Sequence, residues 1–346
     1  MIFRTILAAM AVAVSTVALP DVVPSQDYAH PQQLVAVDGT RRLNLFCMGS
    51  GEPTVLFESG AGDSMVVWRH VQGKVAKVTR ACAYDRAGYG FSDAATRASD
   101  ARNTVDDFHR LLRAAHIRTP IVYVGHSIAG LYGALFAATY PDDVAGIVFV
   151  DPSFPDQFQK MSASLSPAAK ARLYALLNAQ TAIRRACVDL ARKGALAAPA
   201  TDAAKGCVST GDSPDTLDNT LREALTAQYT QAKNFDTQIS EYDNFLPQDG
   251  RPSTDQLEVE AAKFGFGDKP LVVLTHSKPM ALPGLTPAQV AAAEKAWQDG
   301  HDAIAAKSTR GSNMVVPNTG HYIEIDAPGA VTGAVDKVVA EVRAGK

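Results

Sequence analysis

The sequence predicts an α/β protein organised around a doubly wound sheet, and three observations lead to this fold class. Short apolar or β-branched runs recur along the chain, and several are continuous, as expected for strands covered on both faces of a parallel sheet. Helical patterns such as 104–116 and 131–140 fall between these runs. From Asp151 to about residue 262 the alternation gives way to helical sequence, which indicates a cap inserted into the sheet domain.

Eight segments have the pattern of strands: in chain order they are QLVAVDG, RRLNLFC, TVLFESG, RACAYDR, IVYVGHS, GIVFVDP, PLVVLTH and NMVVPNTG. The cap follows the sixth. Within the cap, Ser166-Pro167 and Ser213-Pro214 are predicted helix starts, because proline fits the first turn of a helix. We therefore divide the chain into a core of 32–151 and 262–346 and a helical cap of 152–261.

The N-terminus has the pattern of a secretory signal peptide. MIFR carries one positive charge, TILAAMAVAVSTVAL is a continuous apolar run, and Thr16-Val17-Ala18 offers small residues for signal peptidase. An uncleaved anchor is the alternative, although the run is shorter than the roughly 20 residues of a membrane span. We expect a signal peptide at 1–18, a linker at 19–31, and a protein exported to the periplasm or secreted. No membrane contact is expected after cleavage.

Composition and charge exclude several classes of function. The chain has 346 residues, a net charge of −3 and a pI near 6.2, so it has no basic field to attract nucleic acid or an anionic membrane. The motif G-x-G-x-x-G and other glycine-rich phosphate loops are absent, so no nucleotide or other cofactor is expected. The sequence says nothing about oligomeric state.

Four cysteines remain after the predicted signal peptide. None has a C-x-x-C or Cys/His spacing that would hold a metal, so no metal site is expected. Their even number in an exported protein suggests disulfides, for which the sequence alone allows three pairings. The four are Cys47, Cys82, Cys187 and Cys207.

A candidate nucleophile follows the fifth predicted strand. Residues 125–129, GHSIA, match the G-x-S-x-G turn of a nucleophilic serine except at the last position. Such a turn is crowded, so small residues are needed around Ser127, and the methyl group of Ala129 is tolerable if the helix shifts slightly. Gly130 and Gly133 lack side chains and so let that helix pack closely against the sheet. The alternative is an ordinary buried Gly-Ser turn.

Two further stretches complete a possible site. SGAG at 59–62 ends a strand, and its backbone N–H groups could bind an oxyanion together with the N–H of Ile128. NTGHYIEIDAP places His321 after the last strand. A plain glycine turn and a solvated histidine are the respective alternatives. YDRAGYGFSD at 84–93 is expected to be structural, a turn held by an Arg/Asp network.

Together GHSIA, YDRAGYGFSD, SGAG and TGHYIEIDAP resemble the α/β-hydrolase family, over about 30–151 and 265–346. The resemblance implies a mostly parallel eight-stranded sheet with a cap after strand six. It also implies that Ser127 attacks an acyl carbon and that His321 acts as general base and then acid. The N–H groups of Ala61 and Ile128 would bind the oxyanion.

The acid of this triad is less evident. In the family it commonly follows the seventh strand, but there the first carboxylate is Glu294. The alternative family position follows the sixth strand, which favours Asp151. That residue could instead cap a turn before Pro152. The remaining candidates are Asp299, Asp302 and Asp156.

The resemblance also gives a preferred cysteine pairing. In the family's sheet order the second and fourth strands are neighbours, and these strands carry Cys47 and Cys82. The other two cysteines both lie in the cap. We therefore expect the disulfides Cys47–Cys82 and Cys187–Cys207.

The predicted function is an exported serine hydrolase that cleaves a small-molecule carboxylic ester or lactone. Amide, peptide or C–C bond cleavage by the same triad is the alternative, and a non-catalytic binding protein is less favoured. Serine rather than aspartate at 127 argues against epoxide-hydrolase and dehalogenase chemistry.

Other residues near this site have open roles. His126 is expected to pack or position, Glu58 and Ser59 to neighbour the oxyanion loop, and His276 and Ser277 are possible substrate contacts. The cap aromatics could line a pocket or form the cap's own core: Phe154, Phe158, Tyr174, Tyr229, Phe235, Tyr242 and Phe245.

Overall fold

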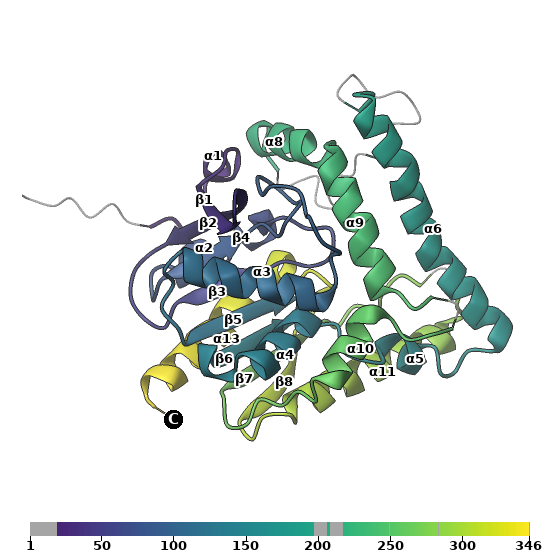
Figure 1. Cartoon of the computed structure of the whole chain (residues 1–346). Coiled ribbons are helices and arrows are strands. Elements are labelled where there is room, and N and C mark those ends of the chain that lie inside the picture. Colours follow the sequence, from purple (N-terminus) through teal and green to yellow (C-terminus); the bar gives the residue numbers. More distant parts are fainter. Residues whose placement is uncertain (1–18, 197–205, 208–216, 249, 283, 346) are drawn as a thin grey trace, which may run out of the picture.

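The computed structural model describes residues 19–196, 206–207, 217–248, 250–282 and 284–345 (Figure 1). The predicted signal peptide and the helix start predicted at Ser213-Pro214 lie outside the described residues. Among the described residues, no helix has the length and apolar character needed to cross a bilayer.

All eight predicted strands are present in one sheet of order β1-β2-β4-β3-β5-β6-β7-β8. The β1/β2 and β2/β4 pairs are antiparallel and the remaining pairs are parallel. The prediction of a mostly parallel eight-stranded sheet is therefore confirmed. The strands are β1 (Gln33–Asp38), β2 (Arg41–Met48), β3 (Val55–Glu58), β4 (Ala81–Tyr84), β5 (Ile121–His126), β6 (Val144–Val150), β7 (Leu271–Thr275) and β8 (Gly311–Val315).

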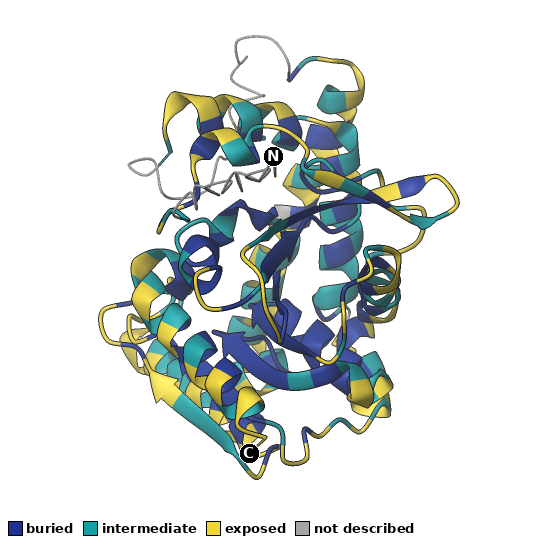
Figure 2. Cartoon of the chain, turned by 90° about the vertical axis from the view of Figure 1, so that its left-hand side faces the viewer, coloured by how far each residue is buried: buried dark blue, intermediate teal, exposed yellow. Residues whose placement is uncertain are grey.

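Helices cover both faces of the sheet, which explains why the central strands are apolar throughout. Ile121 and Tyr123 of β5 face a core shared with α3 (Ala101–Ala114), α4 (Ala129–Thr139) and α11 (Pro287–Ala305). The alternate residues Val122 and Val124 face η1 (Met65–Trp68), α2 (Gln72–Val75) and α13 (Pro328–Arg343). Side chains alternate between the two faces of a strand, so both cores need apolar residues. Figure 2 shows the resulting buried centre.

The cap predicted after strand six is helical. It begins with α5 (Gln157–Met161) and α6 (Pro167–Arg192), whose start at Ser166-Pro167 is as predicted: the Ser166 hydroxyl accepts from the N–H of Ala169. It continues with α8 (Asn219–Tyr229), α9 (Ala232–Phe245) and α10 (Thr254–Ala261). The long helices α6 and α9 pack side by side on one flank of the sheet domain (Figure 1), whereas α10 packs on α3 and α4.

The segment 19–31 packs against the core. It contains the short helix α1 (Ser25–Tyr28), which contacts α8, and the side chains of Val23 and Tyr28 are fully buried. The Tyr28 hydroxyl donates a hydrogen bond to Gln72 at 2.8 Å.

Both expected disulfides are present. Cys47 and Cys82 are register partners on the neighbouring strands β2 and β4, and they are bonded to each other. Cys187 on α6 is bonded to Cys207 within the cap. One bridge therefore joins core strands, and the other closes a loop of the cap.

We expect the Cys47→Ala/Cys82→Ala variant to unfold at lower urea concentration than the wild type. Its bridge spans 35 residues of sequence, and opening a loop of this length costs about 2–4 kcal/mol of unfolding free energy. Thiol titration of the unfolded wild type provides the control: no reactive thiol before reduction and all four afterwards. Equal titration with and without reductant would reject both pairings.

Candidate active site

Ser127 occupies the sharp turn between β5 and α4. Its φ of 54° is in the left-handed region, which a non-glycine residue adopts only when its surroundings enforce it. The surroundings here are backbone hydrogen bonds: the Ser127 N–H donates to Val150 at 3.2 Å, and its carbonyl accepts from Ser153 at 2.7 Å. The turn is thus held by the chain that leaves β6, and its strained conformation is the one that a nucleophilic serine requires.

The structure accommodates alanine at the last position of the motif. A side chain at Gly125 would lie 2.7 Å from the Tyr123 ring and 2.9 Å from the Ala129 carbonyl, so glycine is required there. Ala129 itself is buried, and its carbonyl accepts a hydrogen bond from the Tyr123 hydroxyl at 2.8 Å. The helix α4 comes close to the chain after β6 at the next residue, Gly130. A side chain at Gly130 would lie 2.5 Å from Pro152.

Ser127, His321 and Asp151 form a continuous hydrogen-bonded series. The Ser127 Oγ lies 2.9 Å from His321 Nε2, and His321 Nδ1 lies 2.6 Å from an oxygen of Asp151. An ionised carboxylate can only accept, so Nδ1 carries the proton and Nε2 is free to accept from the serine hydroxyl. This tautomer is the one in which a histidine can remove the serine proton.

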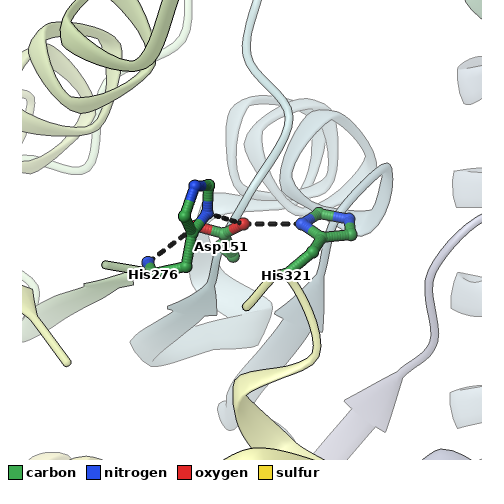
Figure 3. A group of neighbouring side chains, drawn as sticks. All are labelled: Asp151, His276 and His321. Carbon is green, nitrogen blue, oxygen red and sulfur yellow. Dashed lines mark hydrogen bonds and ion pairs between the residues drawn. The ribbon is translucent and has the colours of Figure 1, made fainter. Parts of the chain in front are cut away.

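The carboxylate of Asp151, directly after β6, accepts four hydrogen bonds. Its Oδ2 receives both His321 Nδ1 and His276 Nδ1 at 2.6 Å (Figure 3), and its Oδ1 receives the His276 N–H and Trp297 Nε1 at 3.1 Å. Burial alone would favour the neutral acid, but the hydrogen bonds from His276 and His321 hold its pKa well below the usual value. Asp151 is therefore a fixed anion with all its acceptor sites occupied.

His276 lies on the far side of Asp151 from His321. Its second ring nitrogen is 2.9 Å from the carboxylate of Glu294, on α11. Burial opposes its charge, yet the hydrogen bonds to Asp151 and Glu294 raise its pKa to about 9. Since both ring nitrogens face carboxylates, both must donate, and His276 is an imidazolium at neutral pH. It does not line the cavity described below.

The other candidate acids lie elsewhere. Asp299 pairs with Lys295 at 2.7 Å on the outer face of α11, and Asp302 accepts from Asn313. Asp156 pairs with Lys160 at 3.1 Å. Among these residues, only Asp151 contacts His321.

The donor atoms of Asp151, His276 and His321 lie within 4.8 Å of one another, as the ligands of one metal ion do. Two ligands at tetrahedral zinc are, however, separated by about 3.4 Å. The 2.6 Å contacts here are shorter, and the outer nitrogens of the two rings face Glu294 and Ser127. The cluster is accounted for as a hydrogen-bonded network.

Two backbone amides are candidates for binding an oxyanion. Within the described chain, the N–H groups of Ala61 and Ile128 have no hydrogen-bond acceptor. Ile128 directly follows Ser127, and Ala61 lies in the loop after β3, a strand that pairs with β5. Two free amides at a serine turn can stabilise negative charge on a substrate oxygen.

The loop that carries Ala61 is held by an ion pair between the core and the cap. Arg86 donates to the carbonyls of Ser59 and Gly60 at 2.5 and 2.7 Å, and to Glu241 of α9 at 2.8 Å. Glu241 also accepts from the N–H of Gly62 at 2.9 Å. The Arg86 and Glu241 side chains are only 6% and 1% exposed, so the pair is desolvated. Arg86 and Asp85 of the predicted Arg/Asp turn thus have separate partners, because Asp85 accepts from Met65, Phe91 and Asn44.

His126, Asp63 and Glu324 lie together next to the loop and His321. His126 Nε2 is 3.1 Å from the His321 carbonyl, and burial lowers the pKa of His126 to about 3. Burial raises the pKa of Asp63 to about 7, and that of Glu324, which is 3.3 Å from His126, well above its usual value. His126 is therefore neutral, in agreement with a packing role.

Glu58 and Ser59 play different parts near this loop. Glu58 accepts from the hydroxyls of Tyr84 and Tyr123 inside the sheet. The Ser59 hydroxyl donates to the Ser64 carbonyl across the loop.

A cavity of about 560 Å³ opens between the cap and the core beside His321 and Ala61. This volume suits a small organic molecule. Three of the cap aromatics line it: Tyr229, Phe235 and Tyr242. Phe158 and Phe245 instead pack against each other, Phe154 packs on Trp297, and the Tyr174 hydroxyl contacts Ser162.

Comparison with known proteins assigns the fold to a family. The α/β hydrolase fold family matches residues 53–328, most of the chain. The chain belongs to the α/β hydrolase fold family. A haloalkane dehalogenase DbeA loop variant from Bradyrhizobium elkanii has a TM-score of 0.63 at 18% identity, covering 91% of this chain and 97% of that one. An esterase from Thermogutta terrifontis has a TM-score of 0.56 at 18% identity, covering 90% and 99%. At this identity the two structures show the shared fold alone.

The curated relatives match only part of this chain. The uncharacterized protein YbdG of Bacillus subtilis is 28% identical over 146 residues, which are 42% of this chain and 45% of YbdG. The chain thus spans less than half the length of YbdG. The same holds for two other relatives, the uncharacterized protein YqjL of Bacillus subtilis and the probable transporter efuK of Hormonema carpetanum.

The sequence did not indicate several residues of this α/β hydrolase site. The sequence offers His276 only as a possible substrate contact, and in the structure it binds Asp151. Glu294 is the first acid after strand seven, and its partner is His276 rather than His321. Trp297 and Glu241 have no local signal in the sequence, because their positions depend on how α11 and α9 pack.

We expect the free energy of unfolding to fall as pH rises from about 6.5 to 9, and to fall less in His276→Gln. The folded pKa near 9 exceeds the unfolded value of roughly 6.5, so this stabilisation is complete below pH 6.5 and lost through pH 9. The difference is at most on the order of 3 kcal/mol. Urea unfolding at a series of pH values measures it. The difference in unfolding free energy between the wild type and His276→Gln cancels the contributions of the other titrating groups. Parallel curves of unfolding free energy against pH would contradict an imidazolium at His276.

Proposed function

We propose that this α/β hydrolase-fold protein is an exported serine hydrolase that cleaves a carboxylic ester or lactone through an acyl-enzyme on Ser127. The observation that carries the proposal is the hydrogen-bonded series from Ser127 through His321 to Asp151, beside two free amides. A serine hydroxyl in this setting can attack an acyl carbon, whereas an aspartate would be needed for an alkyl-ester intermediate. The α/β hydrolase fold is consistent with this chemistry but does not select it.

In the proposed first half-reaction, the Ser127 Oγ attacks the carbonyl carbon and its proton passes to His321 Nε2. The carbonyl oxygen becomes an anion, and the N–H groups of Ala61 and Ile128 stabilise it. The bond to the leaving alkoxide then breaks as Nε2 returns the proton to that oxygen. Asp151 keeps His321 oriented and stabilises the imidazolium through its 2.6 Å hydrogen bond.

In the second half-reaction, water replaces the alcohol. His321 Nε2 takes a proton from the water as its oxygen attacks the acyl carbon, and the tetrahedral intermediate collapses with the proton returned to Ser127. A lactone follows the same steps, with its alcohol still attached to the product acid. No cofactor takes part in these steps.

Export is proposed from the signal-like N-terminus, and the two disulfides support it, because such bonds persist in oxidising compartments. A periplasmic or secreted location follows.

We expect the mature protein to hydrolyse at least some p-nitrophenyl esters between acetate and palmitate, and Ser127→Ala to lose roughly 10⁴-fold or more in kcat. A fluorophosphonate should label the wild type and leave the variant unlabelled. The chain length with the highest kcat/KM reports how the cavity accepts the acyl group.

Other outcomes distinguish the alternatives. Faster cleavage of p-nitroanilides than of the esters would favour an amidase or peptidase. Turnover of diketones, with no turnover of esters or anilides, would favour a C–C hydrolase. If the wild type is neither labelled by the fluorophosphonate nor active on any of these substrates, the result would favour a non-catalytic binding protein. Activity retained in Ser127→Ala would contradict the nucleophile.

We expect Glu241→Gln to lower kcat on the best ester about 10- to 100-fold with little change in KM, because the Ala61 amide acts on the charge that develops in the transition state. Glu241 is a positioning residue here, since it holds the loop through Gly62 and Arg86. The control is Asp243→Asn on the same helix, whose partner Arg185 is exposed. A lower melting temperature with unchanged kcat would assign Glu241 a structural role only.

A further inference from the structure

The cap side of the cavity contains a cation that has no carboxylate partner among the described residues. Arg184 of α6 lines the cavity, and its side chain lies over the ring of Tyr242, with the guanidinium carbon 4.1 Å from the ring centre. Its Nε donates to Gln238 at 2.8 Å, and its buried Nη1 has no hydrogen-bond partner in the segments that the structure describes. In the part of the chain that the structure describes, no Asp or Glu lies within ion-pair distance of it.

The neighbouring arginines of the same helix differ. Arg185 forms two hydrogen bonds to Asp243, at 2.8 and 2.6 Å, and Arg192 pairs with Asp236 at 2.7 Å. Both partners are on α9, and both pairs are solvent-exposed. The α6/α9 interface therefore provides an aspartate for each arginine on its outer surface. At Arg184, which faces the cavity, it provides a neutral amide and a phenol ring.

The position of Arg184 relative to the site can be followed through Gln238. A side-chain carbon at Gly62, next to Ala61, would lie 3.9 Å from the Gln238 amide carbon, and Arg184 hydrogen-bonds that same amide. The guanidinium is thus separated from the oxyanion loop by one side chain. A ligand whose reacting carbonyl lies at Ala61 could extend to Arg184 within one small molecule.

The two acids that line the cavity, Asp63 and Asp326, form no ion pair with Arg184 in the described part of the chain. Asp326 accepts a hydrogen bond from the N–H of Gly320 at 2.7 Å, and burial raises the pKa of Asp63 to about 7. Arg69 and His70 line the core side, where burial lowers the pKa of His70 and so favours its neutral form. The Asp, Arg and His residues of the lining are Asp63, Arg69, His70, Arg184, His321 and Asp326, and its tyrosines are Tyr229, Tyr242 and Tyr322.

We infer that the substrate carries a carboxylate or similar anionic group, bound by Arg184 in the cap while the ester lies at Ser127. A guanidinium offers two parallel N–H donors that match a carboxylate, and one stacked on an aromatic ring is already oriented for it. This inference rests on the proposed function, which it narrows from esters in general to anionic esters. The alternative is that Arg184 only links α6 to α9.

The test compares ester pairs of matched size. One pair places the charge in the acyl group (p-nitrophenyl hydrogen glutarate against p-nitrophenyl pentanoate), and the other places it in the leaving group (4-acetoxybenzoate against phenyl acetate). In at least one pair, the wild type is expected to favour the anion about 10- to 100-fold in kcat/KM, as for a charge-assisted hydrogen bond. Arg184→Met should abolish this preference through KM, and leave the neutral ester unchanged. The matched control, Arg185→Met, should keep it.

Two results would overturn the inference while the proposed function stands: no preference for either anion in the wild type, or a preference that survives in Arg184→Met. Equal loss on charged and neutral esters, with a lower melting temperature, would assign Arg184 to the helix link.

If no ester is turned over, the proposed function fails and binding decides the inference separately. Calorimetry with the dicarboxylates from succinate to suberate should then show binding to the wild type, at least about tenfold weaker in Arg184→Met and weaker with added salt. Absent or equal binding would overturn it.

Discussion

The active-site half of this molecule depends on one buried anion. Asp151 stands at the end of a central strand and is fully buried, where an ionised carboxylate is costly unless donors surround it. Its four donors come from three separate segments: the end of β7, the helix α11 and the loop after β8. Satisfying this one group therefore fixes the relative positions of the three segments, and with them the imidazole that faces Ser127.

A second buried charge pair extends this order into the cap. Arg86 binds the carbonyls of the loop after β3, and Glu241 binds both Arg86 and the N–H of Gly62. The Tyr89 hydroxyl also donates to Glu241, at 2.8 Å. Breaking a buried pair is more costly than breaking an exposed one, because the remaining charge has no water to solvate it. The cap thus contributes to the geometry of the proposed oxyanion site as well as to the walls of the cavity.

Much of this architecture could be predicted from the sequence, because it depends on local patterns. Apolar runs locate all eight strands, and Ser127, Asp151 and His321 each directly follow such a run or lie in a short glycine-marked turn after it. Residues on the long helices could not be predicted. Glu241 lies within SEYDNF and Arg184 within AIRRAC, where polar residues look like a solvated surface. Their burial depends on the rotation of α9 and α6 about their axes, which tertiary packing determines. The contacts of His276 could not be predicted for a similar reason, since its partner Glu294 belongs to the separate helix α11.

The contact between Glu241 and the core restricts how this protein could evolve. In a chain assembled from a sheet domain and an insertion, the insertion is the part that recombination could exchange to change specificity. Here an exchanged cap would have to present a carboxylate at the same place, or Arg86 would remain buried without a counter-charge. A buried pair of this kind couples the two parts of the chain, so a substitution at position 86 or 241 is expected to be tolerated best with a compensating change at the other position.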